Sequence, residues 1–200
     1  MDFRLIYRGP LRASGNDVEK EVRARNIHKH EIRKELHPQI KELWKYPPLN
    51  RNFGKSVEPY HPQYLDPNHP RGQKTCGEHR FVALVRSDLE LTAELDILFL
   101  RREFPGTVIL RGGDLDNRLK TLLDALRIPK TPQEIPEDYH PRDDEAPLFC
   151  LLEDDSLVTS LTISASILLD PTVQDSDVHL VMHVHVKGPD REIVNVGMFG

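Results

Sequence analysis

Strand-type and helix-type hydrophobic patterns alternate along this chain, and their order limits the fold more than any other feature. Runs with the composition or alternation of strands occupy residues 2–7, 81–87, 91–100, 107–112, 156–169 and 177–186. Helical spacing of apolar residues occurs twice, at 17–44 and 114–127. The order β–α–β–β–β–α–β–β predicts an α/β protein with a mixed β-sheet and helices packed on it. A chain of 200 residues suits a single domain, here residues 1–200.

The two predicted helices differ in the quality of their apolar stripes. The second has a clean stripe, formed by Leu115, Leu119, Leu122 and Leu126. The first has a looser one, formed by Val18, Val22, Ile32, Leu36, Ile40 and Leu43. Pro38 is expected to kink or restart this helix because proline lacks a backbone donor. His28 and His30 are expected to be exposed, with phosphate contact as the alternative.

Two proline-rich segments predict loops rather than regular structure. Residues 46–79 contain six prolines, and residues 128–150 are proline-rich and strongly acidic, so the second segment is expected to be exposed. The first segment also interleaves aromatic residues with the cations Arg51, Lys55, Arg71 and Lys74. Cations beside stacking rings suit a single nucleic-acid strand. A connection held by a few aromatic residues remains equally open.

The net charge of −5 hides an asymmetry between the two halves of the chain. Residues 1–86 have a net charge of +7 and residues 87–200 have −12. Such an asymmetry is typical of polyanion binding, or of an acidic site beside a basic flank. Drift in composition between two solvated surfaces explains it equally well.

Several classes of protein are disfavoured by what the sequence lacks. Cys76 and Cys150 match no disulfide framework or zinc spacing, and no apolar run has the length of a membrane span. The first ten residues lack the core of a signal peptide, so a cytoplasmic protein without a membrane partner is expected. No phosphate-binding loop, dinucleotide fingerprint or serine or cysteine nucleophile motif is present.

The last predicted strand carries three histidines, His179, His183 and His185, on one face. Its other face is apolar and is the expected core face. Histidines two residues apart on a strand can bind zinc or nickel. A polar outer face without a metal is the alternative interpretation.

Acidic residues form the densest chemical signal in the sequence. Asp114 and Asp116 lie at the predicted start of the second helix, and Lys120 follows Asp116 by four residues, on the same helical face. A second pair, Asp154 and Asp155, precedes the strand at 156–169. If that strand lies beside the helix, these carboxylates converge, and such oxygens with waters and phosphate suit octahedral Mg²⁺. Helix capping and solvation are the alternative roles for these acids.

Together these motifs resemble the RusA-like family of Holliday junction endonucleases. The shared pattern is D-x-D-N-x-x-K, then D-A-L, then a D-D pair opening a strand. It is filled by Asp114, Asp116, Asn117, Lys120, Asp124, Ala125, Leu126, Asp154 and Asp155. The resemblance covers about residues 91–186. Residues 46–79 are additional to the family pattern, and 128–150 is longer and more acidic than the family's connection.

The resemblance implies a homodimeric, Mg²⁺-dependent endonuclease that cuts branched DNA, with Mn²⁺ as a substitute. It implies that Asp114, Asp116 and Asp155 bind the metal, that Asp154 assists, and that Lys120 contacts the scissile phosphate. Arg111, which precedes Gly112-Gly113, joins the four loop cations as a predicted DNA contact. Three alternatives remain open: an inactive nucleic-acid-binding module of the same fold, a protein–protein adaptor using the proline-rich loop, and a nuclease for RNA or single strands.

Overall fold

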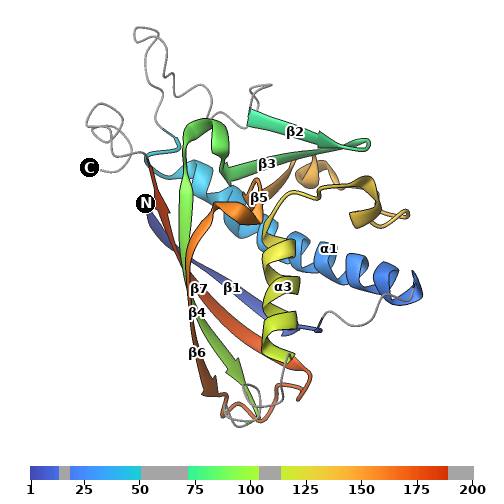
Figure 1. Ribbon diagram of the computed structural model, residues 1–200, viewed down its shortest axis with the longest axis vertical. Helices are drawn as coiled ribbons and strands as arrows, with labels where there is room; N and C mark the ends of the chain where they lie inside the picture. The colour runs from blue at the N-terminus through green and yellow to red at the C-terminus, as the bar shows by residue number, and fades with distance from the viewer. Residues whose placement is uncertain (14–18, 51–71, 104–113, 189–200) are drawn as a thin grey trace, which may run out of the picture.

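The computed structural model describes residues 1–13, 19–50, 72–103 and 114–188 (Figure 1). The longer helices are α1 (Glu19–Glu42) and α3 (Asp114–Leu126). The strands are β1 (Asp2–Pro10), β2 (Gln73–Cys76), β3 (His79–Val85), β4 (Thr92–Arg101), β5 (Leu148–Leu152), β6 (Val158–Ile167) and β7 (Asp177–Lys187). The α/β class is therefore confirmed, and the predicted strand at 107–112 lies outside the described residues.

The strands divide into two mixed sheets rather than the single sheet expected. The larger has the order β1-β7-β4-β6, in which β7 is antiparallel to both neighbours and β4 is parallel to β6. The smaller has the order β2-β3-β5, with β3 antiparallel to β2 and parallel to β5. Helix α1 contacts β1 of one sheet and β5 of the other, so it links the two sheets.

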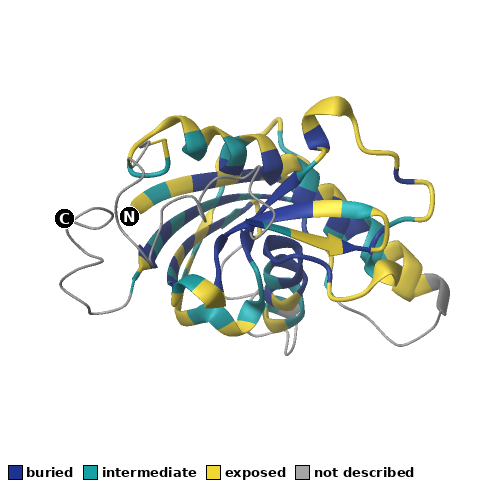
Figure 2. Ribbon diagram, turned by 90° about the horizontal axis from the view of Figure 1, so that it is seen from above, coloured by how far each residue is buried: buried dark blue, intermediate teal, exposed yellow. Residues whose placement is uncertain are grey.

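Both helices lie on one side of the four-stranded sheet, and the main core fills the space between the helices and the sheet (Figures 1 and 2). Strand β7 shows how the sheet contributes to this core. Its residues alternate between buried and half-buried, so one face of the strand packs inward. The predicted core face of this strand is confirmed. Helix α1 adds Ile32, Leu36 and Ile40, and α3 adds Leu122 and Leu126.

Helix α1 departs from its prediction at its histidines. It continues through Pro38 as one helix, so a restart, one of the two outcomes predicted for this proline, does not occur. His28 and His30 are buried, and the expectation that they are exposed is wrong. Both rings lie on the side of the helix that packs against the rest of the molecule: His28 Nε2 accepts from the backbone N–H of Arg12, and the ring of His30 packs edge-on to Tyr139.

The segment at 128–150 is also more ordered than a solvated loop. It contributes Ile128, Ile135 and Tyr139 to a second core, and its end forms β5, whose five residues are all buried. The prediction of an exposed loop is wrong for these positions, because the prolines and acids alternate with apolar residues that face inward. Residues 73–76 at the end of the other proline-rich segment likewise form β2.

No helix among the described residues is long and apolar enough to cross a membrane.

Candidate functional site

The first turns of α3 present two of the motif side chains to solvent. Asp116 and Lys120 are exposed, while Leu119 between them in sequence is buried against the core. This is the arrangement that the i, i+4 spacing predicts. The side chain of Asp114 lies outside the described residues, although the helix begins at that residue.

A basic hollow adjoins the same helix. Its cavity of about 680 Å³ is lined by residues from α3, the end of β1 and the residues after it, the end of β4 and the start of β7, among them Arg12, Arg101, Arg118 and Asp177. A guanidinium NH1 of Arg118 donates to the carbonyl of Leu11, which ties α3 to the end of β1. Its lining holds three arginines and one aspartate, and one of the arginines, Arg101, is buried and forms an ion pair with Glu103 at 3.4 Å. Such a surface suits phosphate.

Asp154 and Asp155 lie in a different environment, at the start of the 3₁₀ helix Asp155–Leu157. Asp154 Oδ1 accepts from the backbone N–H of Ser156 at 3.0 Å, so this side chain caps the turn. The ammonium of Lys130 contacts Asp154 at 3.0 Å and Asp155 at 2.9 Å. Hydrogen bonds from Ser156 and Lys130 hold the pKa of Asp154 well below its usual range, and both carboxylates raise the pKa of Lys130.

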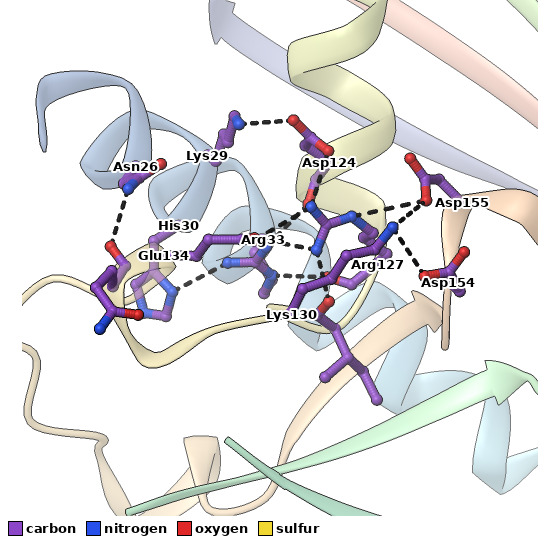
Figure 3. Close-up of polar contacts among 12 residues, drawn as sticks. Asn26, Lys29, His30, Arg33, Asp124, Arg127, Lys130, Glu134, Asp154 and Asp155 are labelled. Atoms are coloured by element: carbon purple, nitrogen blue, oxygen red, sulfur yellow. Dashed lines mark hydrogen bonds and ion pairs between the residues drawn. The ribbon is translucent and has the colours of Figure 1, made fainter. Parts of the chain in front are cut away.

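This acidic pair belongs to a charged network that joins α3 to α1 (Figure 3). Arg127 approaches Asp155 at 3.9 Å and donates to Asp124 at 3.0 Å and to Glu134 at 3.0 Å. Lys29 of α1 reaches the other oxygen of Asp124 at 2.6 Å. Burial opposes ionisation of Asp124, but the bonds and charges of Lys29 and Arg127 outweigh it and lower its pKa. Asp124, a residue of the motif, therefore links α3 to α1 through its ion pair with Lys29.

The two acidic parts of the motif lie at opposite ends of α3. Asp116 is in its first turn, whereas Asp155 contacts Arg127, just beyond its last residue. Eleven residues of helix correspond to about 16 Å along the axis. Accordingly, Asp116, Asp154 and Asp155 do not form a group with ligand atoms within 4.8 Å of one another; in the described part of the chain only Asp2, His183 and His185 do so.

Most of the predicted DNA-binding cations lie outside the described residues. These are Arg51, Lys55, Arg71 and Arg111. Lys74 is described, and its ammonium forms an ion pair with Glu153. Glu153 also accepts from the backbone N–H and the hydroxyl of Ser87, at 2.7 and 2.8 Å. Lys74 thus has a structural partner in the absence of DNA.

Several residues at these sites were not predicted from the sequence. No sequence pattern pointed to Lys130 or Arg127. Their ion pairs with Asp155 depend on the path by which the chain comes back past the end of α3. Arg12 and Arg101 line the same hollow only because the end of β1 and the end of β4 lie near each other in the fold. Asp2 could have been linked to the histidines of the last strand only with the pairing of β1 and β7 known.

Comparison with known proteins found no matching family model, no similar curated protein and no similar solved structure. The resemblance to the RusA-like family therefore depends on the motif residues alone.

Proposed function

We propose that this protein is a Mg²⁺-dependent endonuclease that cleaves phosphodiesters in branched DNA. The observation that carries the proposal is the motif D-x-D-N-x-x-K on α3, whose Asp116 and Lys120 are both exposed. Motif residues with only a structural role in the core would not need to face solvent. Here the carboxylate and the ammonium are both accessible to a phosphate backbone.

The exposed carboxylate suits the proposed ion. Mg²⁺ is commonly held by one or two carboxylates, with waters and substrate phosphate oxygens completing the octahedron. Asp114 and Asp116 would supply those carboxylates, and Mn²⁺ would substitute. An ion held there would supply activation of water and stabilisation of the attacking and leaving oxygens. Lys120 would hold the scissile phosphate, and the arginine-lined hollow beside α3 would hold a neighbouring one.

The second acidic pair fits a metal less well. Asp154 and Asp155 already share the ammonium of Lys130, and they lie beyond the far end of α3 from Asp116. A role for them as ligands of the same ion requires the chain to rearrange. The test of the proposal therefore has to treat Asp116 and Asp155 separately.

The experiment incubates a four-way DNA junction with the protein and Mg²⁺, and compares wild type with Asp116→Asn and Asp155→Asn. We expect Asp116→Asn to lower the cleavage rate by on the order of a hundredfold or more, since it removes a metal ligand. Asp155→Asn has the same effect if Asp155 binds the ion. If it serves only the ion pair with Lys130, the variant loses stability and keeps its cleavage rate. Absence of cleavage by wild type on junction, single-strand and RNA substrates overturns the proposal.

The second candidate function is nucleic-acid binding without catalysis. The ion pairs of Lys130 with Asp154 and Asp155 favour it, because those carboxylates are engaged without a metal. Titration with Mg²⁺ separates the two candidates: a nuclease shows saturable Mg²⁺ binding that Asp116→Asn weakens, and a pure binder does not.

The proposed substrate also implies a homodimer. Two strands of a junction related by two-fold symmetry require two equivalent sites. Sedimentation velocity of the free protein and of its junction complex measures this directly, and a complex with one chain per junction would contradict it.

A further inference from the structure

The outer face of the four-stranded sheet brings two histidines and an aspartate together. His183 and His185 lie two residues apart on β7, and Asp2 of β1 is the cross-strand partner of His185. One ligand atom from each of these three side chains lies within 4.8 Å of the others. This set shares no residue with the acidic motif of α3.

The side chains already point at one another. His183 Nε2 lies 3.8 Å from Asp2 Oδ1, and His185 Nδ1 contacts the same oxygen. The centroids of the two imidazole rings are 3.9 Å apart. Two ring nitrogens therefore converge on a single carboxylate oxygen, and small rotations of the side chains would place all three atoms around one ion.

A second carboxylate is positioned to orient one of the rings. Asp96 of β4 is the cross-strand partner of His183, and its Oδ2 lies 3.7 Å from Nε2 of His185. With a metal ion on Nδ1 of His185, its Nε2 would carry the proton and face Asp96. Histidines that bind metals usually donate their second N–H to a carboxylate or carbonyl, which fixes the ring and its tautomer.

The backbone below these side chains is held by the core. Met182, Val184 and Val186 alternate with the histidines and are buried on the opposite face of β7. The central strand β7 is hydrogen-bonded to β1 on one side and β4 on the other. The positions from which the ligands project are therefore fixed by packing before any ion binds.

The site is open on the solvent side. Both long helices lie on the other side of this sheet (Figure 1), and the side chains of His183, His185 and Asp2 are 27%, 33% and 61% exposed. Three protein ligands with solvent access leave at least one coordination position for water or an added ligand. Closed structural zinc sites, in contrast, have four protein ligands.

We propose that His183, His185 and Asp2 form a binding site for a divalent transition metal, with Asp96 as the positioning residue for His185. Two imidazole nitrogens and one carboxylate favour zinc or a similar ion over Mg²⁺, which prefers oxygen ligands alone. This site is independent of the nuclease proposal, because the latter uses carboxylates and Lys120 on α3.

The test titrates the full chain, purified without a histidine tag and treated with chelator, with Zn²⁺ in an isothermal calorimeter. We expect a saturable isotherm with one Zn²⁺ per chain. His183→Gln and Asp2→Asn should each weaken binding at least about tenfold because each removes a ligand. Asp96→Asn should weaken it by about tenfold through the orientation of His185.

The matched control is His179→Gln. His179 lies on the same strand and on the same face as the cluster, but outside it, so its variant should keep the wild-type affinity within about twofold. The absorption spectrum of the Co²⁺-loaded protein provides a second readout, and His183→Gln should alter it while His179→Gln leaves it unchanged. Circular dichroism verifies that each variant is folded. Non-saturable Zn²⁺ binding by wild type, or equal losses in His179→Gln and His183→Gln, overturns the proposal.

Discussion

Arg33 illustrates how a single buried side chain organises the contact between α1 and α3. It is among the largest fully buried side chains among the described residues. Its guanidinium donates to the carbonyl of Asp124 at 2.9 Å, to that of Arg127 at 3.1 Å and to Nδ1 of His30 at 3.3 Å. These bonds satisfy carbonyl groups at the end of α3 that have no partner within the helix. Arg33 thus acts as a cap supplied by another helix.

We expect Arg33→Met to lower the free energy of unfolding by about 2 kcal/mol or more, because three buried acceptors lose their donor. Relief of the cost of burying a charge offsets only part of this loss. Urea unfolding measures the change. Arg23→Met on the same helix is the control: its ion pair with Glu137 is exposed, and its loss should cost less than about 1 kcal/mol. Equal effects of the two substitutions would contradict this role for Arg33.

His37 is held in one neutral tautomer by its neighbours. The backbone N–H of Phe149 donates to Nδ1 at 2.8 Å, so Nε2 carries the proton and donates to the carbonyl of Asp144 at 2.9 Å. Burial lowers the pKa of His37, although its bond to Asp144 acts in the opposite direction. Burial likewise lowers the pKa of His30 to about 3, together with the charges of Arg33 and Lys34. Both rings therefore stabilise the fold only while neutral.

The pH dependence of stability follows from these lowered pKa values. Below about pH 6.5 the unfolded chain protonates His30 and His37 while the folded chain keeps them neutral, so the free energy of unfolding falls as the pH falls. His37→Gln keeps a donor and an acceptor but cannot titrate. We expect it to reduce the slope between pH 7 and 5 by up to about 1.4 kcal/mol per pH unit. Urea unfolding at several pH values measures the slope, and a slope in His37→Gln equal to that of wild type would contradict this role for His37.

The burial of Arg33 and His37 could not be predicted from the sequence. Residues of these types usually lie on the surface. Their position on the buried face of α1 can be explained only once their partners at the end of α3 and in β5 are known. The apolar positions of the same helix, Ile32, Leu36 and Ile40, were predicted correctly by spacing alone. Polar burial depends on distant acceptors, and no local pattern encodes those.

Among the elements, β5 and β2 show the same limit. The long strands and both helices are visible in the sequence because each has a period or a length that local patterns report. Strand β5 has the sequence LFCLL with all five residues buried, so it shows no alternation, and it follows a proline-rich acidic segment. Its parallel partner β3 lies more than sixty residues earlier in the chain, and this distant pairing makes it a strand. The candidate site follows the same rule, since the helix that carries Asp116 and Lys120 follows from local spacing, whereas the contacts of Lys130 with Asp154 and Asp155 depend on distant parts of the chain.

The complete burial of β5 makes it a test of the link between the two sheets. Leu151 is fully buried in the main core. We expect Leu151→Ala to lower the free energy of unfolding by about 2–5 kcal/mol, the range for truncating a buried leucine. Thermal or urea unfolding measures it. Leu169→Ala, at a side chain that is 83% exposed, should change stability by less than about 0.5 kcal/mol. A small loss at Leu151 would mean that the sheets are only weakly coupled.

For the whole molecule, the structure changes the meaning of the acidic half of the chain. Several of its carboxylates are paired with cations of the basic half of the chain: Asp124 with Lys29, Glu145 with Lys34 and Glu153 with Lys74. The formal charge of −12 for residues 87–200 therefore overstates the negative field that DNA would meet. The hollow formed by Arg12, Arg101 and Arg118 also gives α3 a basic neighbour beside its exposed aspartate. Net charge alone thus does not argue against a nucleic-acid partner.

The salt dependence of DNA binding tests this distribution of charge. If the basic half holds the backbone, Arg51→Gln, Lys55→Gln and Arg71→Gln should each weaken binding and reduce the slope of log K against log salt by about 0.9, the loss of one phosphate contact. Lys74→Gln should have a smaller effect, because Lys74 must leave Glu153 before it can contact phosphate. Fluorescence anisotropy with a labelled junction at several salt concentrations measures all four slopes. Slopes identical to wild type in every variant would show that the asymmetry of charge has no role in DNA binding.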